Sequence, residues 1–337
     1  MSQQKPGAAR ITAAVVAVAA MLPYLTLKIL WMTGSSLGIN DPDLMNDPTM
    51  AGLNAMTFGM DVVGLLLALA FTVRQGMRLP AWLVLLPLWV GTGLLTIVVV
   101  MVPLGVLLEG TGIFSTGGPI EPWVYMMVYG GFVAQGVGLT VAFALYSRDR
   151  WPTAFRTPIG HGPTSVTMPL QRVVARGALL MTVLLGGIRL YWALGGRAGL
   201  PEEMAGLYPA TAALQDGLKG LLAIGAGLGL VILVNGRGGR PVWQPLSVAW
   251  LGTGTMFGWG LYTVIIGLSG GPLSEGSAGG VLAFVNLFEM LTGLVMGMCG
   301  AFLLAERSGV GHVQAAQQPL EGEDRERDGQ PADHGHR

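Results

Sequence analysis

The chain has 337 residues, of which 52% are hydrophobic and only 11% are charged, and its formal net charge is zero. Soluble domains carry roughly a quarter of charged residues, so this composition excludes an ordinary soluble protein and is typical of an integral membrane protein. The absence of a net positive charge also gives no indication of a nucleic-acid partner.

Apolar stretches long enough to cross a bilayer as helices, which takes about 20 residues each, follow one another along the chain. There are eight, at residues 11–32, 53–73, 81–107, 123–147, 173–195, 210–234, 242–268 and 281–305. The first follows basic residues, as in a signal peptide, but it is too long and no small-x-small cleavage site ends it, so it is interpreted as a retained span. We therefore expect an all-α integral membrane protein with eight transmembrane helices in the lipid bilayer.

Basic residues are concentrated at alternate ends of these stretches. They precede the first stretch, follow the second, surround the central connector, and follow the sixth and the eighth. These residues are Lys5, Arg10, Arg74, Arg78, Arg148, Arg150, Arg156, Arg172, Arg176, Arg237, Arg240 and Arg307. The opposite connections contain a single cation, Arg197, against eight acids. Because positively charged connections tend to stay in the cytoplasm, the sequence predicts a cell-membrane protein with both termini cytoplasmic.

A tryptophan pattern occurs twice in the chain at a constant offset of 161 residues. It reads Lys28-x-x-Trp31-x-x-Gly34 and then Arg189-x-x-Trp192-x-x-Gly195. Residues 28–93 and 189–254 align without a gap, with 18 identities in 66 positions, which indicates a duplication. Since a four-span unit returns the chain to its starting side, both copies enter the membrane in the same orientation, and we expect two parallel four-helix repeats.

The repeats define the expected domain organisation. It consists of a first four-span repeat at 1–147, a cytoplasmic linker rich in proline and glycine at 148–172, a second repeat at 173–305 and a cytoplasmic tail at 306–337. The tail has too few apolar residues to offset the entropy of ordering and is predicted to be disordered. The copies differ most after their third span, where GGPIE at 117–121 matches GGPLSE at 270–275 with another offset. Such divergence would let one copy carry the function.

The basic residue and the tryptophan of the repeated pattern are the first candidate site residues. Lys28 and Arg189 lie near the outer interface by their distance from the start of the span, with Trp31 and Trp192 three residues further on the same helical face. One interpretation is anchoring at the interface, with the charged groups reaching water and the tryptophans at headgroup level. The other is that Lys28 and Arg189 face each other across the repeat axis and attract a carboxylate or a lipid phosphate.

A second repeated element, Trp-x-Gly-Thr-Gly, lies deeper in the membrane. Trp89 and Thr92 in the first copy match Trp250 and Thr253 in the second, and Trp89 lies nine residues beyond Pro80, roughly 13 Å into the membrane. Small residues at this depth allow neighbouring helices to pack closely. Alternatively, the glycines expose carbonyl groups beside the threonine hydroxyl and form a polar binding spot with a tryptophan wall, which we regard as the better place for a site.

Carboxylates inside spans are costly to bury and often functional. Asp216 has Lys219 three residues later on the same helix and is expected to pair with it. Asp61 and Glu289 have no such neighbour, and Asn286 lies on the same face as Glu289. Either acid is a candidate to carry a proton, to pair with Lys28 or Arg189, or to form the hydrogen-bonded core of a bundle.

The second copy carries a resemblance in the segment that begins at Arg189 and reads RLYWALGGRAGLP. It resembles the Trp-Ala-Leu-Gly-Gly hallmark of a family of small bacterial four-span membrane proteins with no assigned activity, in which a polar or basic residue precedes the tryptophan. Many members carry histidine where Arg189 stands, so this chain departs from the pattern there. The resemblance implies that the chain contains two tandem copies of one four-span unit, the first more diverged, and it implies no mechanism.

Three functions are compatible with these features. The first is a transporter or small-molecule binder with a site between the repeats for a small anionic or amphipathic ligand. The second is a membrane enzyme acting on a lipid or quinone, with Asp61 or Glu289 as acid or base, although no nucleophile-base or metal constellation is present. The third is a structural or accessory subunit whose tail recruits a membrane protein partner. Cys299 is the only cysteine and no span contains histidine, so no metal or cofactor is expected.

Overall fold

The computed structural model describes residues 6–41, 48–114, 118–161, 167–201, 204, 206, 208–236, 239–269 and 280–327, and beyond Glu306 it describes the backbone only. Helices long and apolar enough to cross a membrane number eight in this part of the chain. They are α1 (Ala8–Met32), α2 (Pro48–Thr72), α3 (Ala81–Glu109), α4 (Pro122–Arg150), α6 (Met168–Ala193), α8 (Ala210–Asn235), α9 (Trp243–Ser269) and α10 (Gly280–Arg327). The prediction of an all-α, multi-pass membrane protein is confirmed.

Glycines in the left-handed region end the first helix of each half. After α1 the chain turns at Gly34, with φ of 95°, and after α6 it turns at Gly195, with φ of 101°. In each turn the next residue donates its N–H to a carbonyl five positions earlier, from Ser35 to Leu30 and from Gly196 to Tyr191. This is the hydrogen-bond pattern of a glycine-terminated helix, and an L side chain at the glycine would be strained there.

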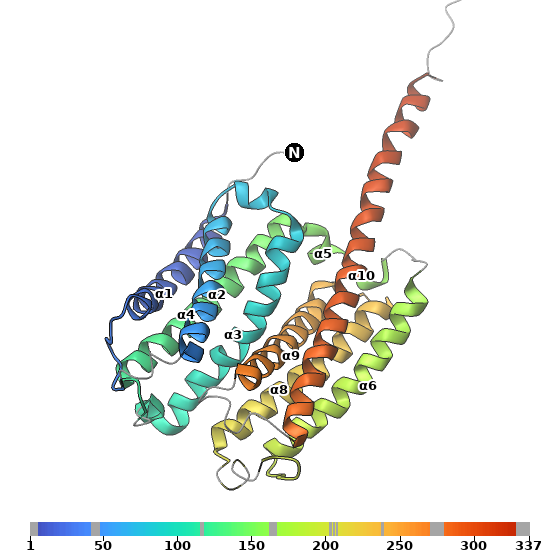
Figure 1. Ribbon diagram of the computed structural model, residues 1–337. Helices are drawn as coiled ribbons and strands as arrows, with labels where there is room; N and C mark the ends of the chain where they lie inside the picture. Colours follow the sequence, from blue (N-terminus) through green and yellow to red (C-terminus); the bar gives the residue numbers. More distant parts are fainter. Residues whose placement is uncertain are drawn as a thin grey trace, which may run out of the picture.

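The helices form two groups of four that meet along one contact (Figure 1). In the first group α1 packs against α2 and α4, and α3 packs against α4 and α2. In the second group α6 packs against α8 and α10, and α9 packs against α10 and α8. Each group has its own buried apolar core. The main contact between the groups is made by α3 and α9, which lie in the middle of the molecule.

The connector between the groups is shorter than the predicted linker at 148–172, because α4 continues to Arg150 and α6 begins at Met168. Between them lie a short helix, α5 (Pro152–Arg156), and a 3-10 turn, η4 (Ile159–His161). The connector is attached to the α8–α9 turn, since the N–H of Ile159 donates to the Arg240 carbonyl at 3.0 Å.

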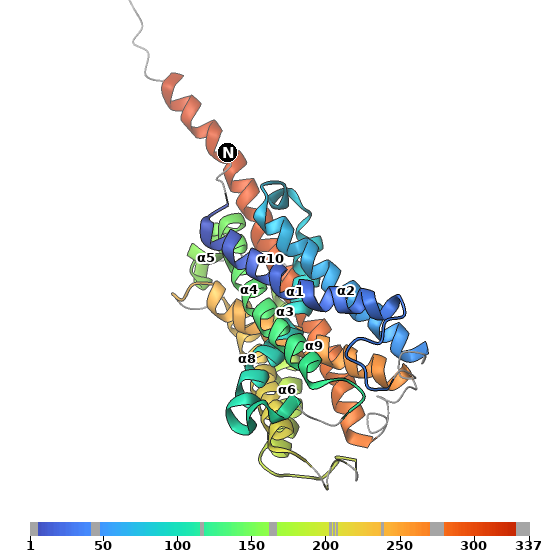
Figure 2. The ribbon, with the colours of Figure 1, turned by 90° about the vertical axis from the view of Figure 1, so that its left-hand side faces the viewer.

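Both described ends of the chain lie on one side of the bundle, which is called the amino-terminal side below; the other is the loop side (Figures 1 and 2). Helix α10 leaves the bundle there and continues to Arg327. The expected disorder of the tail from residue 306 stays a prediction, and residues 328–337 lie outside the described residues. Extending a helix that the membrane segment has already nucleated is far easier than starting a new one, which explains the continuation.

Candidate functional site

Lys28 is buried inside the first group of helices. Its side chain has no solvent exposure, and its ammonium Nζ lies 3.3 Å from Oδ2 of Asp61 on α2. The ammonium group also lies 4.1 Å from the centroid of the Tyr24 ring. Gln135 of α4 adds a side-chain hydrogen bond to Asp61. Lys28 therefore does not reach the membrane surface, so the anchoring interpretation is wrong for this residue, and an ion pair compensates its burial.

Arg189 occupies the equivalent position in the second group and has more partners. Its Nε and Nη2 donate to the two oxygens of Glu289 on α10 at 3.0 and 2.8 Å. Its Nη1 donates to Asp216 on α8 at 2.6 Å, and Nη2 also donates to Asn286 at 2.5 Å. The planar guanidinium suits this arrangement, because it can bind one carboxylate through two parallel hydrogen bonds and still reach a second.

Two further polar groups complete what is called the Arg189 cluster: Arg189, Asp216, Glu289, Asn286, Tyr208 and Lys219. The Tyr208 hydroxyl, from the segment that precedes α8 on the loop side, donates to Asp216. Burial and then this contact raise the pKa of Tyr208, so its hydroxyl keeps its proton at neutral pH.

Lys219 does not form the expected pair with Asp216. Asp216 is instead bound by Arg189, which comes from another helix, and the Lys219 ammonium lies 4.7 Å from the centroid of the Trp259 ring. A contact of this kind attracts a cation to the face of an aromatic ring. The prediction failed because sequence spacing describes neighbours on one helix only, whereas α6 brings the Arg189 guanidinium, which donates one hydrogen bond to the same carboxylate.

The alternative interpretation, that Lys28 and Arg189 face each other across the repeat axis, does not fit the structure either. Each is neutralised by acids of its own group, and α1 and α6 lie at opposite edges of the molecule (Figures 1 and 2). Other helices, α3 and α9 among them, lie between α1 and α6, so the two cations cannot bind one ligand together. Asp61 and Glu289 do pair with Lys28 and Arg189 respectively, which was one of the alternatives for these acids.

Gln135 is a residue that the sequence-based reasoning missed. It lies 154 positions before Glu289, and 154 is also the offset between Glu121 and Glu275 at the ends of the matching GGPIE and GGPLSE segments. An alignment of the fourth spans at this offset would have placed Gln135 opposite Glu289. The second group thus has a carboxylate where the first has a neutral amide.

Trp31 and Trp192 stabilise the turns that follow α1 and α6. The indole Nε1 of Trp31 donates to the carbonyl of Leu37, and that of Trp192 to the carbonyl of Ala198, both at 2.9 Å. Both rings are buried, with 8% and 0% exposure. The anchoring interpretation is therefore wrong for these tryptophans too, because a ring at headgroup level would be exposed to lipid.

The deeper repeated element forms the contact between α3 and α9. Nε1 of Trp89 donates to the Thr253 hydroxyl at 2.9 Å, and Nε1 of Trp250 donates to the Thr92 hydroxyl at 3.0 Å. The two bonds are reciprocal, since each tryptophan binds the threonine of the other copy. All four side chains thus use their polar groups within the protein.

Glycine allows the backbones of α3 and α9 to touch at this contact. A Cβ atom added at Gly93 would lie 2.1 Å from the carbonyl carbon of Gly254, and one added at Gly254 would lie 2.4 Å from the carbonyl oxygen of Trp89. No room is left between the helices at this point. The geometry favours the packing interpretation of the Trp-x-Gly-Thr-Gly element over a ligand site there.

Comparisons with family models, with curated proteins and with solved structures found no match to this chain. Within the described residues, no group of three or more histidine, cysteine, aspartate or glutamate side chains is placed to hold a metal ion. The chemistry of the site must therefore be inferred from its own residues. The richest constellation is the Arg189 cluster, with two cations, two carboxylates, an amide and a hydroxyl.

Proposed function

We propose that the protein is a transporter or binding protein for a small zwitterionic solute, and that the Arg189 cluster is its site. The observation that carries this proposal is the hydrogen-bonded set around one guanidinium, in which Arg189 contacts Asp216, Glu289 and Asn286 from two neighbouring helices. Charged groups inside transmembrane bundles are expensive to bury and commonly mark a substrate or ion pathway.

The proposed ligand class follows from the charge of the cluster. Arg189 and Lys219 balance Asp216 and Glu289, so the formal net charge of these four groups is zero. A ligand with a net charge would leave one charge uncompensated in the bundle, at a cost of several kcal/mol. A small solute with both a carboxylate and an ammonium group adds no net charge and finds partners of both signs. We therefore propose a zwitterion in place of the small anionic or amphipathic ligand expected from the sequence.

The proposed route to the cluster is from the loop side. Tyr208 is half-buried and covers Asp216, and the Arg197 guanidinium lies 4.6 Å from the centroid of the Tyr208 ring. Release of the hydrogen bond between Tyr208 and Asp216 would expose the carboxylate without disturbing the helices. In this proposal the first group, with its simpler pair of Lys28 and Asp61, serves mainly as a scaffold.

The proposed architecture is a pair of parallel four-helix repeats in the cell membrane, with both termini in the cytoplasm. Supporting the repeats, the helix contacts of the first group recur in the second, and the turn glycines, the tryptophan-to-carbonyl bonds and the reciprocal bonds between α3 and α9 recur at the offset of 161. Supporting the orientation, the basic connections lie at the ends of the helices on the amino-terminal side.

A binding and transport experiment tests the proposed site. The purified protein is screened by thermal unfolding against glycine and other amino acids, and against acetate and methylamine as singly charged controls. A zwitterion at about 100 times its dissociation constant should stabilise the wild type by about 2.7 kcal/mol. Hits are then assayed for uptake into proteoliposomes. In this assay Arg189→Lys should abolish binding and uptake, and Tyr208→Phe should alter uptake with little change in fold stability.

The matched control for this experiment is Lys28→Arg, which alters the equivalent cation of the first group. It should leave binding unchanged. If no zwitterion stabilises the wild type, or if Lys28→Arg and Arg189→Lys have equal effects on uptake, the Arg189 cluster is a structural element of the bundle and the proposed function is wrong.

A structural or accessory role is favoured by one specific observation. Helix α10 extends beyond the membrane segment, which ends at Glu306, as far as Arg327 (Figures 1 and 2). These 21 further residues correspond to about 30 Å of helix on the amino-terminal side. If the accessory role is the main one, deleting residues 307–337 should abolish the association with a partner protein. If solute transport is the main function, the same deletion should leave solute uptake intact.

A further inference from the structure

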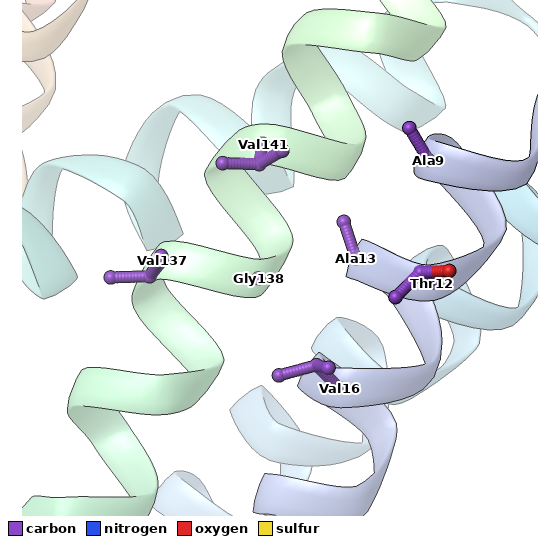
Figure 3. Close-up of a pocket in the computed structure, with 7 residues that line it drawn as sticks. All are labelled: Ala9, Thr12, Ala13, Val16, Val137, Gly138 and Val141. Carbon is purple, nitrogen blue, oxygen red and sulfur yellow. The ribbon is translucent and has the colours of Figure 1, made fainter.

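A groove lies between α1 and α4 on the surface of the first group (Figure 3). Its volume is about 410 Å³. The side chains along it are small or branched and almost entirely apolar: Ala9, Thr12, Ala13 and Val16 from α1, and Val137 and Val141 from α4. Because Ala9 is the second residue of α1, the groove lies in the half of the membrane on the amino-terminal side.

The floor of the groove is formed by the backbones of the two helices. A Cβ atom added at Gly138 would lie 2.9 Å from the Ala13 carbonyl oxygen and 3.0 Å from the Ala17 nitrogen. The helices therefore touch behind the groove, while small side chains at Ala9 and Ala13 leave its front unfilled. In a bilayer such a depression faces lipid chains.

The second repeat has larger side chains at four of the corresponding positions and a smaller one at a fifth, where Gly177 corresponds to Val16. At the offset of 161, Ala9, Thr12 and Ala13 correspond to Leu170, Val173 and Val174, and at the offset of 154, Val137 corresponds to Leu291. Only the first copy thus combines these small residues on α1 with the close approach of α4. The groove is thus a feature of the first half, just as the Arg189 cluster is a feature of the second half.

A positively charged side chain lies beyond the upper end of the groove. Arg148 follows Val141 by seven residues on α4, which is about two turns or 10 Å along the same helical face. Its side chain is 63% exposed. Its acidic neighbour Asp149 lies closer to Arg10, at 3.1 Å, than to Arg148, at 3.7 Å. Arg148 thus retains donors for an anion at the level of the lipid phosphates.

We propose that this groove binds one acyl chain of an anionic phospholipid, whose phosphate is held by Arg148. The length of the groove fits this ligand better than a partner helix. From Ala9 to Val16 it extends about 10 Å along α1, so it lies within one leaflet, whereas a second transmembrane helix would pack along most of the 30 Å or so of the hydrocarbon core. Basic sites between helices at the membrane surface are suited to anionic headgroups.

Native mass spectrometry with defined lipids tests this proposal. The full chain, purified in detergent, is mixed with equal amounts of phosphatidylglycerol and phosphatidylcholine. The wild type should retain one phosphatidylglycerol molecule in preference to phosphatidylcholine. Arg148→Gln should weaken the binding of phosphatidylglycerol about fivefold and leave that of phosphatidylcholine unchanged, since one interfacial charge is lost. A double variant, Ala9→Leu with Thr12→Val, fills the groove with the larger side chains that the second repeat has at these positions. It should reduce the binding of both lipids.

The control variant is Arg176→Gln, which removes an exposed cation from α6 on the same side of the membrane. It should not change lipid binding. The proposal is overturned if Arg176→Gln and Arg148→Gln weaken binding equally, because the attraction is then non-specific, or if the filled groove binds phosphatidylglycerol like the wild type. Thermal unfolding checks that each variant is folded, and the result does not depend on the function of the Arg189 cluster.

Discussion

Lys28 and Arg189 lie at equivalent positions, but their surroundings differ in ways that matter for stability. Lys28 has a single carboxylate partner at 3.3 Å, whereas Arg189 binds two carboxylates and an amide. Removing one partner of a buried ion pair leaves a charge without compensation, which is far more costly than replacing the whole set by neutral groups. The loss of stability on substituting each cation therefore depends on how many buried carboxylates lose their partner.

At Arg189 we expect substitution by methionine to lower the free energy of unfolding by about 3–5 kcal/mol, since both Asp216 and Glu289 would lose their main partner. Lys28→Met should cost less, because it affects one acid that also has Gln135. Thermal unfolding in detergent measures both effects. Adding Asp216→Asn and Glu289→Gln to Arg189→Met should restore part of the lost stability; no recovery would contradict the electrostatic explanation.

The buried tryptophans of the turns allow a second test at single residues. Trp192→Phe removes a hydrogen bond to the Ala198 carbonyl from a side chain with no exposure and should destabilise the protein by about 1–3 kcal/mol. Trp243, which is 40% exposed, serves as the control, and Trp243→Phe should have little effect. Equal shifts in the unfolding midpoint would indicate that Trp192 acts at the membrane surface after all.

At the scale of helices, the close approach of α3 and α9 holds the two groups together. Two reciprocal hydrogen bonds connect Trp89 with Thr253 and Trp250 with Thr92, and glycine backbones meet between them. Association of helices in lipid depends on van der Waals packing and such polar contacts, because apolar side chains gain little by leaving an apolar solvent. Any added atom at the point of contact must therefore separate the helices.

Neighbouring glycines of α3 provide a matched pair of variants for this contact. Gly93→Ala would place its Cβ 2.1 Å from the backbone of Gly254, so the helices must move apart, and overpacking of this kind costs about 1–3 kcal/mol or more. Gly91→Ala meets nothing within 4 Å and should leave stability unchanged or slightly higher. Unfolding midpoints of the two variants in one detergent give the comparison. Equal stability of the two would show that α3 and α9 are not in close contact.

At the scale of the whole molecule, the two sides of the bundle differ in charge and in what they carry. Both described ends and the basic connections lie on the amino-terminal side, while Tyr208 and the tryptophan-stabilised turns lie on the loop side. The orientation in the membrane thus decides whether the Arg189 cluster is reached from outside the cell or from the cytoplasm.

Cysteine accessibility in intact cells tests the orientation. The single native cysteine, Cys299, is removed by Cys299→Ala, and cysteines are then introduced at exposed positions on either side. Ser36→Cys on the loop side should react with an impermeant thiol reagent, and Arg78→Cys on the amino-terminal side should react only after lysis. The reverse pattern would invert the proposed topology and would place the Arg189 cluster near the cytoplasmic surface.

The chain by itself determined the features that depend on local composition. The number of spans follows from apolar stretches as long as the bilayer is thick, and all eight are helices in the structure. Asp61 and Glu289 were identified as candidates because charge inside a span is costly wherever it occurs. Lys28 and Arg189 were identified because each belongs to the repeated tryptophan pattern. The disorder predicted from residue 306 stays a prediction, although composition does not reveal that a membrane helix can nucleate the segment as far as Arg327.

Only the tertiary structure decided which of these residues meet. Asp216 could be assigned to Lys219 from spacing on one helix, yet α6 brings Arg189 to it from another. The repeated tryptophans near the surface are buried supports of turns, and the deeper ones cross between the two halves. The physical reason is that helix periodicity specifies the face on which a side chain lies, whereas the neighbour on that face depends on how the helices pack.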